Sequence, residues 1–253
     1  MMRRVIRGLK AAADLILPRV CLVCGLKLGL DEKHICKACL DDMPLTRYHM
    51  LRHNPMADKL NDIIQQQLEV RWEGGEDVRE RYAYATALFF YSSEAGYRHI
   101  PYQIKYHGNT RAGRYFGRML GGEIAMTAWL SDVDAIIPVP LHWHRKWSRG
   151  YNQAEIIAAE VAKVLEVPMR TDLLKRRRHT KTQTKLKISA KAANVKGAFT
   201  ASRPPGTDLR HILLIDDVFT TGSTLGACFR ALREVFPPSV RISVATLAFV
   251  GET

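Results

Sequence analysis

Residues 211–224 read HILLIDDVFTTGST, and this stretch decides the fold. Residues 211–215 form a largely apolar run with the length of a buried strand, and Asp216 and Asp217 follow it directly. A turn rich in hydroxyl residues, with Gly222 near its end, leads into apolar residues at helical spacing. The stretch therefore predicts a strand, a loop and a helix, with two carboxylates at the carboxyl end of the strand.

The turn has the composition of a phosphate-binding loop. Small hydroxyl residues and a glycine let backbone amides and hydroxyls converge on a phosphate, and the positive end of the following helix faces the same anion. Two adjacent carboxylates can accept hydrogen bonds from vicinal ribose hydroxyls, in the crevice where open α/β sheets bind ligands. We interpret the loop as a ribose 5-phosphate site with these candidate residues: Asp216, Asp217, Val218, Phe219, Thr220, Thr221, Gly222, Ser223 and Thr224.

A plainer interpretation of the same residues is a capped helix start. Thr or Ser would then cap the helix, and the acids would serve only as caps or metal ligands, as in receiver domains, whose strands also end in acids. Neither role requires both acids together with a hydroxyl-rich loop. The combination therefore favours the sugar-phosphate interpretation.

Composition is that of a globular protein with one substantial core and a small appendage. The chain has 253 residues, of which 47% are hydrophobic and 25% are charged, and this balance excludes a disordered or fibrous chain. Its formal net charge of +13 favours an anionic partner, because such a field attracts polyanions. Phosphorylated ligands, nucleic acid and acidic lipid all fit that charge.

Strand and helix patterns alternate along the chain, which predicts an α/β fold with a mostly parallel sheet flanked by helices. We expect a basic helix and a cysteine module in residues 1–45, a connector in 46–80 and the main domain in 81–253. Residues 170–196 are basic and poor in large apolar side chains, so we expect them to be mostly exposed. Expected strands are 84–91, 134–140, 211–215 and 240–250, and expected helices include 97–106, 111–130 and 151–167.

Four of the five cysteines form two close pairs, Cys21-Leu-Val-Cys24 and Cys36-Lys-Ala-Cys39, separated by eleven residues. Two such pairs predict a tetrahedral Zn²⁺ site in which every position is filled by protein, so the metal would be structural. A redox pair or simple disulfides are the alternatives, and His34 is a rival ligand. Free thiolates also indicate a reducing compartment, so we expect a cytoplasmic protein.

The first 20 residues combine five basic side chains with short apolar runs. The runs are much shorter than a membrane span, and no small-residue cleavage site follows them, so we predict neither a transmembrane segment nor a signal peptide. We interpret residues 1–20 as an amphipathic helix that packs on its own domain. Contact with a membrane surface or with DNA is the alternative.

The loop 216–224 resembles the binding signature of type I phosphoribosyltransferases. Together with Ile137-Pro-Val-Pro-Leu141, Arg149-Gly-Tyr-Asn-Gln153 and residues 183–199, behind a cysteine module, it resembles the ComF family, which is linked to competence and DNA use. This resemblance covers most of the chain. It implies a phosphoribosyltransferase fold that binds phosphoribosyl pyrophosphate with Mg²⁺, behind an N-terminal zinc finger.

The resemblance also implies a site for the pyrophosphate leaving group and a mobile lid. Residues 138–150 occupy the place of the pyrophosphate loop, where Arg145, Lys146 and Arg149 would neutralise the anion. Lys181 and Lys185 fit a basic lid that excludes water on closure. A solvated basic turn is the alternative for the first group, and we assign no catalytic base.

Two functions follow from these motifs. The first is transfer of a phosphoribosyl group to an unidentified acceptor in DNA uptake or utilisation, so whether the chain is an enzyme stays open. The second is a non-catalytic accessory protein that binds single-stranded DNA and retains the sugar-phosphate pocket, with other DNA-uptake proteins as partners. Basic residues 175–178 suit phosphate backbones, and Trp143, Trp147 and Tyr151 can stack on bases or fill the core.

Overall fold

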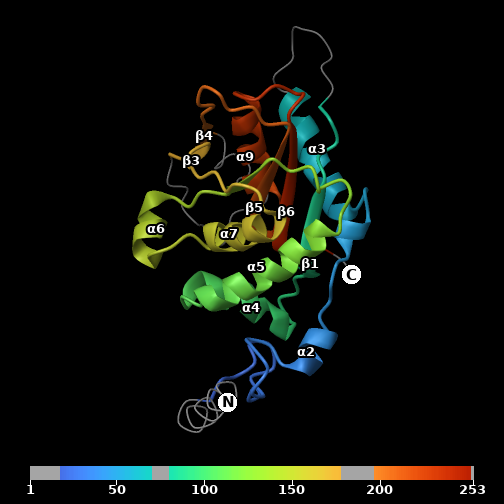
Figure 1. Ribbon diagram of the computed structural model, residues 1–253, viewed down its shortest axis with the longest axis vertical. Coiled ribbons are helices and arrows are strands. Elements are labelled where there is room, and N and C mark those ends of the chain that lie inside the picture. Colours follow the sequence, from blue (N-terminus) through green and yellow to red (C-terminus); the bar gives the residue numbers. More distant parts are fainter. Residues whose placement is uncertain (1–17, 70–79, 178–196, 252–253) are drawn as a thin grey trace.

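The computed structural model describes residues 18–69, 80–177 and 197–251. Its centre is a sheet of four parallel strands in the order β1-β6-β5-β2 (Figure 1). The expected α/β fold with a mostly parallel sheet is therefore confirmed. The strands are β1 (Ala85–Phe90), β2 (Ala135–Pro138), β5 (His211–Phe219) and β6 (Arg241–Phe249).

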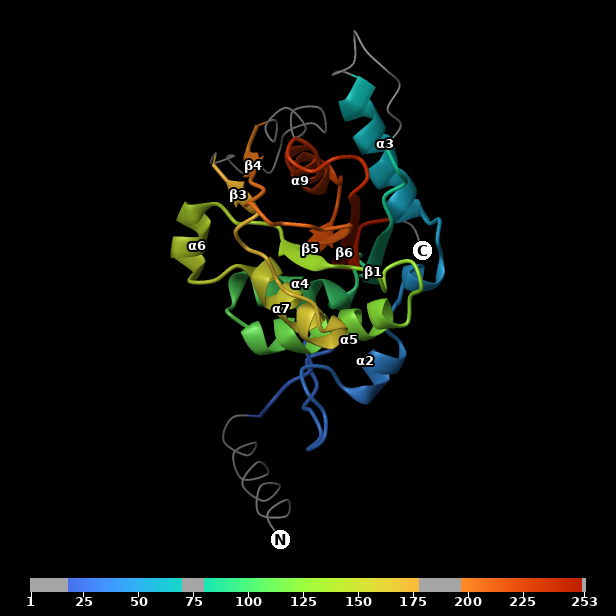
Figure 2. The same cartoon turned by 45° about the horizontal axis from the view of Figure 1, so that its top comes forward.

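Helices cover both faces of this sheet (Figure 2). Because both faces are covered, β5 and β6 are buried along nearly their whole length and read as continuous apolar runs. Within the ranges that the structure describes, no helix is both long and apolar enough to cross a membrane. One face carries α3 (Pro55–Glu69) and α9 (Ser223–Arg233), and the other carries α4 (His99–Tyr106), α5 (Thr110–Ala125) and α7 (Gln153–Leu165).

Smaller elements lie around these layers. The basic stretch 170–196 was expected to be mostly exposed, but Leu173 and Leu174 at its start are buried, because β3 packs against α9. β3 pairs with β4 in an antiparallel ladder. The smaller elements are α2 (Lys37–Asp41), η1 (Tyr48–Met50), η2 (Gly96–Arg98), α6 (Trp143–Arg149), β3 (Leu174–Arg176) and β4 (Phe199–Ala201).

Helix α3 lies inside the segment 46–80, which the sequence analysis interprets as a connector. Met56, Leu60 and Ile64 recur every fourth residue along it, and all three are buried in the core beside α9. Spacing of this kind places apolar side chains on one helix face, and burial of that face is the main source of helix stability in proteins. This part of the segment therefore packs with the main domain, and the predicted domain boundaries stay predictions.

Helices α5 and α7 pack closely through a row of glycines. Gly113, Gly117 and Gly121 recur every fourth residue of α5, on the face that meets α7. A Cβ atom at Gly117 would lie 3.1 Å from the carbonyl oxygen of Ile157 and 3.2 Å from its Cα, so backbone atoms occupy the space. The row allows a close approach that any larger side chain would prevent.

We expect Gly117→Leu to lower the free energy of unfolding by about 2 kcal/mol or more, because overpacking at a backbone contact forces the helices apart. Gly122 is the matched control, since a Cβ there meets nothing within 4 Å. Gly122→Ala is expected to raise stability by about 0.5–1 kcal/mol through helix propensity. Urea unfolding of both variants tests this contact, and equal stability of Gly117→Leu and the wild type would contradict it.

Candidate functional site

The two carboxylates of the candidate loop lie just beyond the point where strand β2 stops pairing with β5. Pairing of β2 with β5 ends at Pro138 and Ile215, so Asp216 and Asp217 follow the last paired residue on that side. The backbone N–H of Asp217 donates to Asp216 Oδ1 at 2.8 Å, and that of Val218 donates to Asp217 Oδ1 at 2.9 Å. These bonds orient both carboxylates at the carboxyl end of β2, where α/β sheets bind ligands.

A lysine from a different element completes the charge pattern. Lys105 Nζ, in the last turn of α4, lies 2.9 Å from Asp217 Oδ2. The side chain of Asp217 is 5% exposed and that of Lys105 is 27% exposed, so the pair lies at the boundary of the interior. Burial lowers the pKa of Lys105, but the charges of Asp217 and Asp216 outweigh it and hold that pKa above its ordinary value. Lys105 is therefore a cation at the site.

The pKa of the Asp216 carboxyl lies close to neutral pH. Desolvation and the adjacent charge of Asp217 raise its pKa to about 7, while Lys105 acts in the opposite direction. An ionised carboxylate accepts hydrogen bonds, whereas a protonated one also donates. The ability of this acid pair to accept bonds from sugar hydroxyls therefore changes near neutral pH.

Gly222 shapes the turn that follows the acids. It has φ +74°, in the left-handed region that favours glycine, and it is the N-cap of α9. A Cβ there would lie 2.5 Å from Ile63 Cδ1 and 2.7 Å from the ring of Phe219, so space as well as conformation requires glycine. Thr221 Oγ1 and Ser223 Oγ lie 3.0 Å apart across the turn. Hydroxyls and the start of α9 thus meet at one place.

Helix α3 supports this turn from outside the motif. Lys59 Nζ donates to the carbonyl oxygen of Thr220 at 3.0 Å, and its ammonium also lies 6.0 Å from the centre of the Phe219 ring. Ile63 packs against Gly222 from the same helix. The sequence analysis missed these contacts, because nothing local to residues 59–63 indicates which loop they meet.

The segment expected to hold pyrophosphate contains a short helix, α6, rather than an open loop. Arg149 at its end places its guanidinium 5.0 Å from the centre of the Tyr106 ring and donates to Gln153 Oε1 at 3.0 Å. Tyr151 Oη donates to the carbonyl oxygen of Ile104. The structure thus brings Arg149 to the same end of α4 that carries Lys105.

Several predicted residues lie outside what the structure describes. The side chains of Arg145 and Lys146 are among them, although their backbone is part of α6. Lys181 and Lys185 fall in residues 178–196, which the structure does not describe. Their proposed contacts with pyrophosphate and their role in a lid stay predictions.

The four cysteines of the N-terminal module come together as the sequence predicts. The sulfur atoms of Cys21, Cys24, Cys36 and Cys39 all lie within 4.8 Å of one another, an arrangement that can bind a metal such as zinc. Backbone N–H groups of Val23 and Cys36 donate to Cys21 Sγ at 3.4 Å. Burial raises the pKa of the Cys21 thiol, but the backbone N–H groups of Cys24, Cys36 and Val23 outweigh it and lower that pKa to about 7, which favours a thiolate. None of these four cysteines is in a disulfide.

Two further residues, the rival ligand His34 and the fifth cysteine Cys228, lie outside the cluster. His34, the rival ligand, packs its ring 5.7 Å from that of Tyr115 and does not belong to the cysteine cluster. Cys228 is buried on α9. The module is joined to the main domain by Tyr97, whose hydroxyl donates to the carbonyl oxygen of Cys39 at 2.8 Å.

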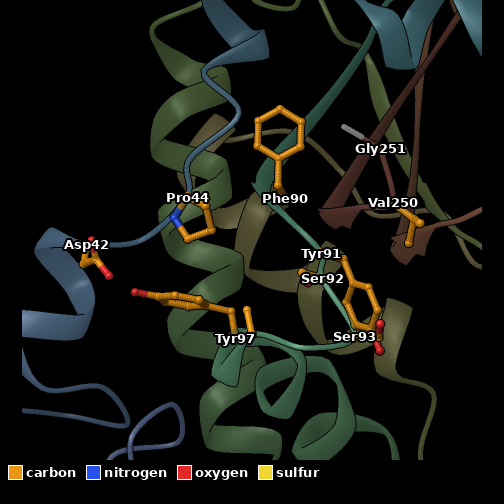
Figure 3. Close-up of a pocket in the computed structure, with 10 residues that line it drawn as sticks. Asp42, Pro44, Phe90, Tyr91, Ser92, Ser93, Tyr97, Val250 and Gly251 are labelled. Atoms are coloured by element: carbon orange, nitrogen blue, oxygen red, sulfur yellow. The ribbon is translucent and has the colours of Figure 1, made fainter. Parts of the chain in front are cut away.

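A cavity of about 680 Å³ lies between the module and the carboxyl ends of β1 and β6 (Figure 3). Figure 3 shows the Tyr97 hydroxyl directed toward Asp42, while the Phe90 ring points away from Tyr97. None of the described residues that line the cavity is a lysine or an arginine, so this lining does not supply the cations that a phosphorylated ligand needs. Its lining is Asp42, Pro44, Phe90, Tyr91, Ser92, Ser93, Ala95, Tyr97, Val250 and Gly251, and the sequence analysis indicated none of them as a site.

Comparison with known proteins identifies the domain. Residues 152–252 match the phosphoribosyl transferase domain family. The chain is 37% identical over 110 residues to competence protein F of Haemophilus influenzae, which covers 43% of this chain and 48% of that protein. It is 32% identical over 129 residues to DNA utilization protein YhgH of Escherichia coli, which covers 50% of this chain and 56% of that protein.

Solved structures give a weaker likeness. A glutamine phosphoribosylpyrophosphate amidotransferase from B. subtilis, complexed with ADP and GMP, is 17% identical with a TM-score of 0.35, over 53% of this chain and 26% of that chain. The matched region spans about half the length of the two curated relatives. The chain is a homologue of competence protein F and DNA utilization protein YhgH that carries a phosphoribosyl transferase domain, which confirms the resemblance to the ComF family and to type I phosphoribosyltransferases.

Proposed function

We propose that this protein binds phosphoribosyl pyrophosphate, with Mg²⁺, through residues 216–224 and acts in DNA uptake or utilisation. One observation carries the proposal. Two adjacent carboxylates lie near the end of β5, and a hydroxyl-rich turn leads from the end of that strand into α9, within the matched domain. The names of competence protein F and YhgH support the biological context.

Each part of the loop has a physical role in this proposal. Asp216 and Asp217 accept hydrogen bonds from the two ribose hydroxyls. Thr220, Thr221 and Ser223 surround the 5-phosphate together with backbone N–H groups of the first turn of α9, which have no carbonyl partner inside the helix. The loop therefore recognises the ribose and its phosphate, and leaves the pyrophosphate to other residues.

The proposed reaction is transfer of the phosphoribosyl group to an acceptor. Such a transfer passes through an oxocarbenium-like ribose as pyrophosphate leaves, so cations near the leaving group lower the barrier. Bound Mg²⁺ would neutralise part of the pyrophosphate charge. Arg149, with Arg145 and Lys146 of the same helix, would hold the leaving group, and Lys181 and Lys185 would close over it.

The cysteine cluster fits Zn²⁺ in particular. Tetrahedral coordination with Zn–S bonds of about 2.3 Å separates sulfurs by about 3.8 Å. Cys24 Sγ and Cys36 Sγ are 3.8 Å apart, which matches that spacing. Cys21, Cys24, Cys36 and Cys39 would supply every ligand, so the ion would stabilise the module without taking part in catalysis. Because the thiolates must stay reduced, we place the protein in the cytoplasm.

A second function, binding of single-stranded DNA, has its own supporting observation. Trp143 and Trp147 on α6 are 68% and 83% exposed, and Tyr102 and Tyr106 on α4 are also exposed. Aromatic rings in water are available to stack on unpaired bases, and the chain's positive charge attracts the phosphate backbone. This function needs no turnover at residues 216–224, so the two functions can be separated by mutation.

We expect the double substitution Asp216→Asn with Asp217→Asn to weaken binding of phosphoribosyl pyrophosphate with Mg²⁺ by about a hundredfold or more, since two charged hydrogen-bond acceptors are lost. Calorimetric titration of zinc-loaded protein measures the change. Asp41→Asn with Asp42→Asn is the matched control, because it removes an adjacent acid pair that is exposed and outside the loop. No binding by the wild type would sink the proposed function, and unchanged binding by the double variant would sink the role of the acids.

For the metal, we expect Cys39→Ser to reduce bound zinc and to lower the melting temperature, because a ligand of a closed structural site is lost. Elemental analysis and thermal unfolding measure the two effects. Cys228→Ala, which changes a cysteine outside the cluster, should retain the zinc. Equal zinc content in the wild type and Cys39→Ser would contradict the predicted ligand set.

For the DNA-binding function, we expect Trp143→Ala with Trp147→Ala to weaken binding of single-stranded oligonucleotides about tenfold, since stacking contributes about 1–3 kcal/mol per base. Replacement of Arg176, Arg177 and Arg178 should also weaken oligonucleotide binding and reduce the dependence of that binding on salt. Fluorescence anisotropy at several salt concentrations measures both, with the exposed Met126→Ala as the control. Binding that is insensitive to both salt and the tryptophans argues against this function.

A further inference from the structure

Lys105 reaches the candidate site from outside every motif that defines it. It lies in the last turn of α4, more than one hundred positions before the acid pair in sequence. Among the residues that the structure describes, it is the cation whose ion pair joins Asp217, at 2.9 Å between Nζ and Oδ2. Contact of this length between unlike charges is strong only where water is largely excluded.

The end of α4 is held in place by the segment that follows β2. Tyr151 Oη donates to the carbonyl oxygen of Ile104, next to Lys105 in sequence. Arg149 lies over the ring of Tyr106, on the other side of Lys105 in sequence. The contacts of Ile104 and Tyr106, the sequence neighbours of Lys105, therefore fix the helical turn that carries it. In this position the Lys105 ammonium faces the acid pair.

In the part of the chain that the structure describes, the other titratable groups around the acids include no second cation in an ion pair with either carboxyl. Cys228, on α9, is buried beside Asp216, and its pKa is raised well above the ordinary value by burial and by the Asp216 charge, so it stays a neutral thiol. Arg176 of β3 acts on Cys228 in the opposite direction. Tyr106 adds a weaker influence on Lys105. Within the described ranges, Lys105 is thus the cation that contacts the acid pair, and its charge favours the ionised form.

We propose that Lys105 is a positioning residue of the phosphoribosyl site, whose ammonium favours the ionised form of the Asp216–Asp217 pair, the form that accepts hydrogen bonds from ribose hydroxyls. Two adjacent carboxylates in a desolvated place repel each other, and one of them takes up a proton unless a cation offsets the repulsion. A protonated carboxyl cannot accept the same bonds at every oxygen. The ammonium therefore acts on the ligand through the acids.

This inference rests on the proposed function and deepens it, because it predicts how ligand binding depends on pH. As the pH falls through the pKa of Asp216, about 7, the pair gains a proton and binding of the sugar phosphate weakens. Removal of the Lys105 charge raises that pKa further, so the loss of binding begins at a higher pH. A residue that served only to hold α4 in place would lower affinity equally at every pH.

The experiment uses zinc-loaded full-length protein with Lys105→Met, Lys105→Gln and Lys105→Arg. Affinity for phosphoribosyl pyrophosphate with Mg²⁺ is measured by calorimetry between pH 6 and 9. We expect the two neutral variants to move the midpoint of the pH dependence upward by about one unit and to bind about tenfold more weakly near neutral pH, because a neighbouring opposite charge shifts the pKa of a carboxyl by about 1–3 units. Lys105→Arg should restore most of the wild-type profile.

Two controls separate the possible failures. Lys163→Met removes a lysine that pairs with Glu160 at 3.0 Å on the surface of α7, and it should leave the profile unchanged. Carbon-13 NMR titration of the Asp216 carboxyl, without ligand, measures the effect of Lys105 even if the wild type binds no phosphoribosyl pyrophosphate and the proposed function fails. An unchanged Asp216 titration in Lys105→Met overturns the proposal. Failure of both neutral variants to fold, with normal folding of Lys105→Arg, would overturn it in favour of a structural role.

Discussion

The structure depends on placing two adjacent carboxylates near the carboxyl end of a buried parallel strand, beyond the last residue that pairs with β2. Charged groups lose hydration in such a place, and the pKa of Asp216 rises to about 7 as a result. The fold offsets this cost with backbone N–H donors within β5 and with the ammonium of Lys105 from α4. A strand that only filled the core would gain nothing from acids here, so the arrangement itself points to a polar ligand.

Several other elements of the chain contact β5 or the turn that follows it. β6 and β2 flank β5 and cover its edges, while α9 begins at Ser223, after the Gly222 N-cap of the turn that follows β5. α3 contacts the turn through Lys59 and Ile63, and the end of α4 contacts the acids through Lys105. The close packing of α5 on α7 fixes the layer on which α4 rests. Elements far apart in sequence therefore converge on one loop.

Local pattern predicted much of this arrangement. The run 211–215 specified a buried strand, and the paired cysteines specified a cluster, because each depends on side chains near one another in sequence. Helix α3 was missed, although Met56, Leu60 and Ile64 carry its apolar period, because polar residues around them resemble a linker. The Lys105–Asp217 ion pair could not be predicted, since it depends on the path of the whole chain. Burial of Leu173 and Leu174 in a basic stretch had the same cause.

The most direct test of the central claim is a crystal structure of the zinc-loaded protein with phosphoribosyl pyrophosphate and Mg²⁺. The ribose hydroxyls are predicted to lie within hydrogen-bond distance of Asp216 and Asp217, with the 5-phosphate against residues 220–224 at the start of α9. A ligand bound elsewhere, or a loop that stays empty at saturating ligand, would contradict the assignment of residues 216–224 as a phosphoribosyl site.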